Sequence, residues 1–113
     1  MIETVESEEK LLAIIIRDSF DESGIHFFTP NEFSQQLAFM RRPQDEEIGA
    51  HVHNPVSRKV EYTQEVLFIR SGRLRVDFYT SEQVYLHSRV LEEGDVILLA
   101  DGGHGFKVLE EVQ

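Results

Sequence analysis

Residues 73–79 read Arg-Leu-Arg-Val-Asp-Phe-Tyr, and this stretch decides the fold because apolar and polar residues alternate along it. Leu74, Val76 and Phe78 fall on one face of an extended chain, and the charged residues fall on the other. A period of two residues is typical of a β-strand with one face in a hydrophobic core. The stretch therefore predicts a strand that forms one wall of such a core.

Similar signals recur on both sides of this stretch, separated by glycine, proline and asparagine. Further strands are predicted at Leu11–Arg17, Gln35–Arg42, Ile48–His53, Glu65–Arg70, Val84–Leu91, Asp95–Ala100 and His104–Leu109. Gly72 lies between two strands, so Glu65 to Tyr79 is predicted to form a hairpin in which Gly72 takes a positive φ. A short helix at Pro30–Phe39 is the competing interpretation, because Pro30-Asn31-Glu32 resembles a helix start. Many short strands with Gly and Pro turns predict an all-β sandwich or barrel.

The length of 113 residues allows a single domain, expected to span residues 1–113. The acidic opening, residues 1–9, is expected to be a loose tail or a solvated strand edge. The chain stops at Gln113 just after a predicted strand, where a barrel would use another strand to close its edge. We therefore expect the sequence to be shortened at this end.

Charge and composition exclude several classes of function. The formal net charge is −10, which repels phosphate backbones and argues against nucleic-acid binding. There is no cysteine, so disulfides, thiolate metal sites and cysteine nucleophiles are excluded. The longest apolar run, Leu11 to Ile16, is far below the roughly 20 residues that cross a bilayer. The N-terminus is acidic where a targeting peptide would be basic, so we expect a cytoplasmic protein without a membrane partner.

Three histidines and one glutamate form the candidate site. In a strand, His51 and His53 point to the same face and can converge on one cation. Glu65 shares a face with apolar residues, where a carboxylate is costly unless it is paired or bound to a metal. His104 follows Asp101-Gly102-Gly103, a glycine turn suited to aiming a side chain into a cavity. This nitrogen and oxygen donor set suits one divalent ion of Fe, Mn, Ni, Cu or Zn.

Each of these residues also has an ordinary structural interpretation. His51 and His53 could lie at the surface beside a proline-containing loop, and His104 could cap a turn. Glu65 could reach solvent or pair with an arginine at the end of its strand. The remaining histidines, His26 and His87, match no motif, and we expect His87 to be solvated.

The order of these residues resembles the two motifs of the cupin superfamily over Ile48 to Val108. The likeness rests on His51-x-His53, on Glu65 ahead of Gly72, and on residues 94–99 (Gly-Asp-Val-Ile-Leu-Leu) leading to His104. It implies a double-stranded β-helix, the cupin-type jelly-roll barrel, with His51, His53, Glu65 and His104 as metal ligands. Asn54 to Gln64 separate the second histidine from the glutamate, which implies a long loop with Glu61 as a rival ligand.

The resemblance implies a small metal-binding cupin that binds or transforms a small polar metabolite, for example a sugar-derived or carboxylated one. A ligand-binding or sensory module without catalysis, and a metal-free sugar isomerase, are the alternatives. Arg41-Arg42 and Arg58-Lys59 are the only basic doublets, and one of them is expected to lie at the barrel mouth and hold an anionic group of the ligand, with Arg41 as the candidate residue. Solubility and local ion pairing are their ordinary roles.

Two aromatic residues and an outer face complete the predictions. Tyr62 and Phe106 are candidates for lining the cavity, although aromatic residues in a small β-domain are more often core. Apolar residues fall on both faces of two predicted strands: Ile48, Ala50 and Val52 of one, and Val66 and Phe68 of the other, face away from the candidate ligands. We therefore expect a homodimer packed through that outer face.

Overall fold

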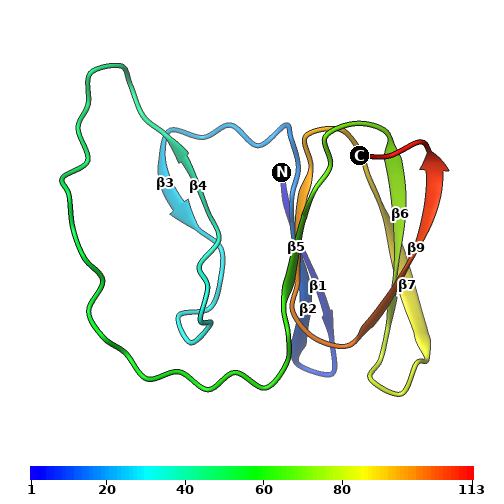
Figure 1. The fold of residues 1–113 in the computed structure, drawn as a ribbon. Helices are drawn as coiled ribbons and strands as arrows, with labels where there is room; N and C mark the ends of the chain where they lie inside the picture. Colours follow the sequence, from blue (N-terminus) through cyan, green and yellow to red (C-terminus); the bar gives the residue numbers. More distant parts are fainter. The chain divides into compact units, whose positions relative to one another are not determined.

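The computed structural model describes residues 1–113 and contains nine β-strands and no helix. The strands are β1 (Ile2–Ser7), β2 (Lys10–Ile16), β3 (Gly24–Phe27), β4 (Ala38–Arg41), β5 (Glu65–Phe68), β6 (Arg73–Tyr79), β7 (Tyr85–Leu91), β8 (Val96–Leu99) and β9 (Gly103–Glu110). They fall into two compact units, both drawn in Figure 1: unit 1 consists of Met1–Phe20 and Tyr62–Gln113, and unit 2 of Asp21–Glu61. The chain therefore has no helical segment long and apolar enough to pass through a membrane.

Unit 1 contains two antiparallel sheets that face one another (Figure 1). The first has the strand order β1-β2-β8-β5, and the second has the order β7-β6-β9. Strands distant in the sequence pair directly, since Ala13 of β2 and Glu65 of β5 both lie opposite Leu99 of β8. Both sheets are open, so each keeps two edge strands.

The hydrophobic core of unit 1 fills the space between these sheets. Leu74, Val76 and Phe78 of β6 are buried, as their alternation predicts. The opposite wall includes Ile15 of β2 and Ile97 of β8, which are both fully buried. Apolar area removed from water contributes about 25 cal/mol per Å², so this interdigitated layer is the main source of stability of unit 1.

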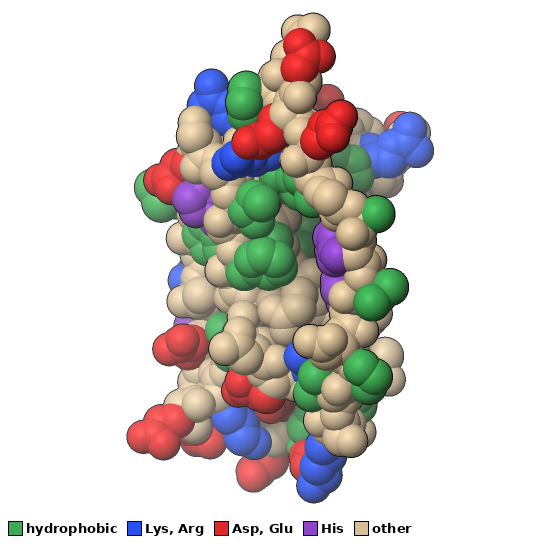
Figure 2. All heavy atoms as spheres, turned by 90° about the vertical axis from the view of Figure 1, so that its left-hand side faces the viewer, with side chains coloured by type: hydrophobic (Ala, Val, Ile, Leu, Met, Phe, Trp, Pro, Cys, Tyr) green, Lys and Arg blue, Asp and Glu red, His purple; other side chains and the backbone are tan.

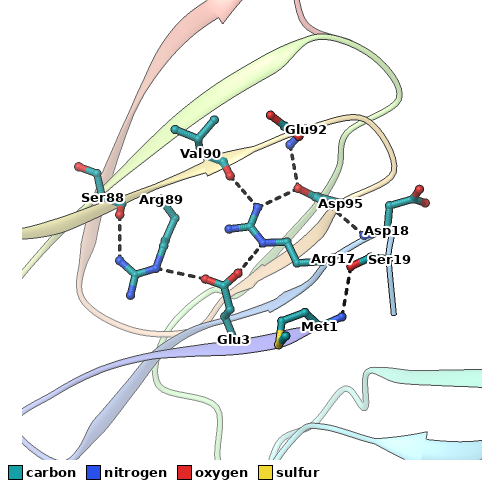
Figure 3. Close-up of polar contacts among 10 residues, drawn as sticks. All are labelled: Met1, Glu3, Arg17, Asp18, Ser19, Ser88, Arg89, Val90, Glu92 and Asp95. Atoms are coloured by element: carbon teal, nitrogen blue, oxygen red, sulfur yellow. Dashed lines mark hydrogen bonds and ion pairs between the residues drawn. The ribbon is translucent and has the colours of Figure 1, made fainter. Parts of the chain in front are cut away.

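Arg17 forms an ion pair with Asp95 within the first sheet and a hydrogen bond that reaches the second sheet (Figure 3). Arg17, just after β2, donates through Nη1 to the main-chain oxygen of Val90 in β7 (2.6 Å) and to Oδ2 of Asp95 (2.9 Å). The main-chain amides of Asp18 (2.9 Å) and Glu92 (2.8 Å) donate to the same carboxylate. Asp95 is only 4% exposed, and these donors satisfy its buried charge.

Glu3 of β1 extends this network along the edge of the sandwich. Its carboxylate accepts hydrogen bonds from Nε of Arg17 (2.5 Å) and from Nε of Arg89 in β7 (3.3 Å). The hydrogen bond from Arg17 holds the pKa of the Glu3 carboxyl below its usual value, and the same bond raises the pKa of the Arg17 guanidinium. Strand β1 therefore belongs to the sandwich, and the acidic opening of the chain forms a strand edge rather than a loose tail.

Unit 2 is built on the antiparallel hairpin of β3 and β4, in which Gly24 lies opposite Arg41 and Phe27 opposite Ala38. The loop between the two strands is held by Thr29, whose hydroxyl donates to the side-chain oxygen of Gln36 (2.7 Å) and accepts from the amide of Leu37 (3.1 Å). No residue from Arg42 to Glu61 lies in a strand.

Most of the predicted strands are confirmed to within a few residues. The segments at Leu11–Arg17, Glu65–Arg70, Val84–Leu91, Asp95–Ala100 and His104–Leu109 correspond to β2, β5, β7, β8 and β9. The all-β class with antiparallel pairing is confirmed, and the competing helix at Pro30–Phe39 does not form. The predicted strand at Gln35–Arg42 is shorter, covering only Ala38–Arg41.

Two local predictions are wrong, and one strand was not predicted. Ile48–His53 is not a strand: its side chains are all exposed, and no neighbouring chain supplies hydrogen bonds or an apolar face. Glu65 to Tyr79 is not a hairpin, because β5 pairs with β8 and β6 pairs with β7 and β9. Gly72 does take a positive φ of 90°, where it allows the chain to leave one sheet and enter the other. Strand β3 was not predicted.

Candidate functional site

The clearest pairing of candidate residues joins Glu65 and His104 in unit 1. Oε1 of Glu65 lies 3.4 Å from Nε2 of His104, although 38 residues separate them in the chain. The His104 side chain is 25% exposed and the Glu65 side chain is 54% exposed, so the pair lies at the margin of the sandwich. This arrangement brings together two of the four predicted ligands.

The strand pairings explain why Glu65 and His104 lie close together. Glu65 is the first residue of β5, an edge strand of the first sheet, and His104 is the second residue of β9, an edge strand of the second sheet. His104 lies opposite Phe78 of β6, so its side chain is on the face that forms the core. The two edges therefore face one another where the space between the sheets opens to solvent.

The glycine turn before His104 has the predicted form. Oδ1 of Asp101 accepts a hydrogen bond from the amide of Gly102 (2.6 Å), and Gly102 takes a φ of 72°. A Cβ on Gly102 would lie 2.8 Å from the main-chain oxygen of Tyr79, so the turn packs tightly against the end of β6. This packing fixes where β9 begins and hence where His104 lies.

Phe106 forms the apolar side of this site. Its ring centroid lies 5.5 Å from that of His104, with the two rings tilted by 56°. Phe106 shares the inner face of β9 with His104, yet it is 46% exposed because β9 is an edge strand. Of the predicted cavity-lining residues, Phe106 is therefore next to a candidate ligand, while Tyr62 is an exposed residue of the loop before β5.

His51 and His53 lie close together in unit 2. Their rings stack with centroids 5.6 Å apart and an angle of 24° between planes. Nδ1 of His51 lies 2.8 Å from the main-chain oxygen of Gly49, a contact that a protonated Nδ1 makes as a donor. Both residues are exposed, and they adopt this common orientation without belonging to a strand. The structure thus contains two pairs of predicted ligands, one in each unit.

The separation of Glu65 and His104 fits a shared metal ion. Two ligand atoms bound at about 2.1 Å and at the tetrahedral angle lie roughly 3.4 Å apart. The oxygen and nitrogen of Glu65 and His104 have this separation, so they suit two positions of one ion. Within neither unit do three or more His, Asp or Glu side chains come close enough to hold a metal. Two protein ligands alone hold an ion weakly.

The remaining candidates have other partners. Nη1 of Arg41 lies 3.5 Å from Oδ1 of Asp21, an exposed ion pair within unit 2. Nζ of Lys59 lies 2.8 Å from Oε1 of Glu61, the rival ligand. His87 is partly buried rather than solvated: its ring packs edge-on against Phe78 at 6.0 Å, and its Nε2 is buried without a hydrogen-bond partner.

The sequence analysis missed a polar cluster on the outer face of the second sheet. Asp77 is buried, and its carboxylate accepts hydrogen bonds from Nε of Arg75 (2.8 Å) and from the hydroxyl of Ser88 (2.5 Å), which is also 2.8 Å from that of Tyr85. The hydrogen bonds from Arg75 and then Ser88 hold the pKa of Asp77 below its usual value. The cross-strand pairing of Asp77 with Ser88 could not be read before the register was known.

Comparison of the chain with models of protein families, with curated proteins and with solved structures gave no match.

Proposed function

We propose that this protein binds a divalent transition-metal ion and uses it to bind or transform a small polar metabolite. Glu65 and His104 supply two ligands, and His51 and His53 supply the other two. The observation that carries the proposal is the approach of Glu65 to His104 across two sheets, at a separation suited to a shared ion. The likeness of the motifs to those of cupins supports the full set of four.

The chain's own residues have separate roles in this proposal. Glu65 contributes a charged oxygen, and the three imidazoles contribute neutral nitrogens, a donor set suited to Fe, Mn, Ni, Cu or Zn. When bound, the ion would act as a Lewis acid or a redox centre for a ligand that occupies its open positions. The ring of Phe106 packs against the His104 imidazole and provides an apolar side to the site.

The finer description of the fold belongs to the same proposal. We propose that the facing sheets of unit 1 are those of a cupin-type jelly roll, a double-stranded β-helix. Two antiparallel sheets around one core, with strands paired across long sequence separations, support this description. We also propose that the protein is cytoplasmic and forms a homodimer through an outer face that includes Val66 and Phe68, which are 49% and 58% exposed.

Metal analysis of the purified protein tests the central claim. Protein prepared without chelators is expected to contain about one transition-metal ion per chain, and Glu65→Gln, His104→Ala and the double variant His51→Ala/His53→Ala are each expected to lose most of it. His26→Ala is the matched control, since His26 matches no motif position. Equal metal content in all of these proteins would overturn the proposal.

Turnover and binding are distinguished by a second experiment. A metal-dependent enzyme loses activity in EDTA and regains it when the ion is restored, whereas a metal-free isomerase keeps its activity in EDTA. A binding module shows a ligand-induced rise in melting temperature without turnover. Light scattering at micromolar concentration tests the dimer, which a monomer in the wild-type protein would exclude.

A further inference from the structure

Unit 2 contains four cationic side chains, and three of them have carboxylate partners within the unit. Arg41 pairs with Asp21, Arg42 with Glu46, and Lys59 with Glu61. Arg58 is the fourth, and no carboxylate lies within ion-pairing distance of it. In a protein with a net charge of −10, an arginine without an acidic partner is the exception.

The hydrogen bonds of Arg58 leave most of its guanidinium available. Nε and Nη2 both donate to the main-chain oxygen of Asn31, at the long distances of 3.4 and 3.3 Å. Donor–acceptor distances of this length correspond to weak hydrogen bonds. The Nη1 atom donates to no acceptor in the protein. The contact with Asn31 therefore orients the side chain without satisfying its charge.

A cleft of about 540 Å³ lies beside Arg58. Its walls include the polar side chains of Ser34, His53 and Asn54, none of which forms a hydrogen bond within the chain, and the apolar side chains of Val52 and Val56. Gln36 also lines it, but its amide is already bonded to the main-chain oxygens of Pro30 and Phe33. Figure 2 views the molecule from the left-hand side of Figure 1 and shows histidine side chains next to exposed hydrophobic ones.

We propose that this cleft binds a small metabolite that carries an oxyanion, a carboxylate or a phosphate ester, with Arg58 holding the charged group. A guanidinium presents a planar fork of donors that matches two oxygens of such a group. Ser34 and Asn54 supply additional hydrogen bonds, and Val52 and Val56 contact the carbon skeleton. A volume of this size is in the range of sites for small molecules.

This inference differs from the sequence-based expectation, which assigned the anionic group to Arg41. The ion pair of Arg41 with Asp21 already compensates that charge, whereas Arg58 has no such partner. The site lies within unit 2 and needs no metal ion. It therefore goes beyond the proposed metal centre, and either proposal can fail without the other.

The test is an NMR titration of the full-length protein with inorganic phosphate and, separately, with malonate, both in the presence of EDTA. The Nε–H resonance of Arg58 and the backbone amides of Asn54 and Val56 are expected to shift in a saturable manner with at least one probe. Sodium chloride at matched ionic strength serves as the salt control. A preference for malonate or for phosphate identifies the carboxylate or the phosphate ester as the natural group.

Variants make the result specific to Arg58. Arg58→Ala is expected to weaken binding at least about ten-fold, and Arg58→Lys to weaken it less, because a lysine keeps the charge and loses the fork. Lys59→Ala is the matched control, since the neighbouring lysine is paired with Glu61, and it is expected to leave binding unchanged. Dispersed amide spectra of each variant show that it is folded. The inference is overturned if neither probe shifts these resonances, or if Arg58→Ala binds as the wild type does.

Discussion

Nη1 of Arg17 donates a 2.6 Å hydrogen bond to the main-chain oxygen of Val90, and this contact joins β2 of one sheet to β7 of the other (Figure 3). The same nitrogen donates to Asp95, which precedes β8 and is 4% exposed. One guanidinium therefore satisfies a buried carboxylate and a main-chain carbonyl on opposite layers of unit 1. The contact aligns the two sheets at the margin of the core.

Replacing Arg17 should expose how much unit 1 depends on this contact. Arg17→Ala leaves the Asp95 carboxylate buried without its cation, and such a change lowers the free energy of unfolding by about 3 kcal/mol. Urea denaturation followed by circular dichroism measures the change. Arg42→Ala removes a cation from the exposed pair with Glu46, which water screens, and is expected to change stability far less. Similar losses in both variants would contradict the role given to Arg17.

The stability of unit 1 should fall in acid. The hydrogen bond from Arg17 holds the pKa of Glu3 below 4.5 in the folded state, while the unfolded chain keeps the ordinary value. Because the folded pKa is the lower one, the unfolded chain binds the proton first. The stabilisation is therefore complete above pH 4.5 and is lost as the pH falls through the folded pKa.

Urea midpoints measured from neutral to acidic pH test whether stability falls as the pH is lowered. Glu3→Gln is expected to be less stable than the wild type at neutral pH and to lose less stability on acidification. Glu6→Gln, an exposed substitution on the same strand, is expected to follow the wild-type curve. A Glu3→Gln curve parallel to that of the wild type would exclude the linkage.

Phe78 should be among the costliest residues to truncate. It is 1% exposed and belongs to the core of unit 1, so Phe78→Ala removes a large buried ring and is expected to cost about 3–5 kcal/mol. Phe27→Ala makes the same chemical change at a side chain of unit 2 that is 66% exposed, and its expected cost is below about 1 kcal/mol. If urea denaturation shows the same loss of stability for both variants, Phe78 is not a central residue of the core.

Gly72 and Gly49 form a second matched pair. Gly72 has a φ of 90°, and a Cβ there would lie 2.0 Å from the main-chain oxygen of Glu111, so Gly72→Ala must displace the backbone. A destabilisation of at least about 1–2 kcal/mol is expected from the left-handed conformation alone. A Cβ on Gly49 would meet nothing within 4 Å, and Gly49→Ala is expected to be neutral. Melting temperatures of the two variants should diverge accordingly.

The alternation at Arg73 to Tyr79 predicted β6 and its buried face, because that strand has one side in the core and one in polar surroundings. Periodicity alone could not say which strands would pair. The turn at Gly72 is compatible with a hairpin, but β5 pairs with β8 instead, where Ile97 and Leu99 share the face that forms the core. Register between distant strands depends on tertiary packing, which no local pattern contains.

The candidate site was also predicted only in part from the sequence. Glu65 and His104 were chosen on their residue types and spacing, and they meet in the structure. The strand assigned to Ile48–His53 does not form, because a short β-branched segment needs a neighbouring strand to satisfy its main chain. The sequence could not show that Arg41 has a carboxylate partner and Arg58 has none, because ion pairs are revealed only by the folded chain.

The insertion of Asp21–Glu61 between β2 and β5 has a consequence for folding kinetics. The first sheet cannot be completed locally, since β2 must wait for β8, which follows it by about eighty residues. A topology with such non-local pairing is expected to fold in milliseconds to seconds. The entropy of closing the intervening segment grows only logarithmically with its length, so evolution could lengthen or shorten this insertion at little cost to the sandwich that carries it.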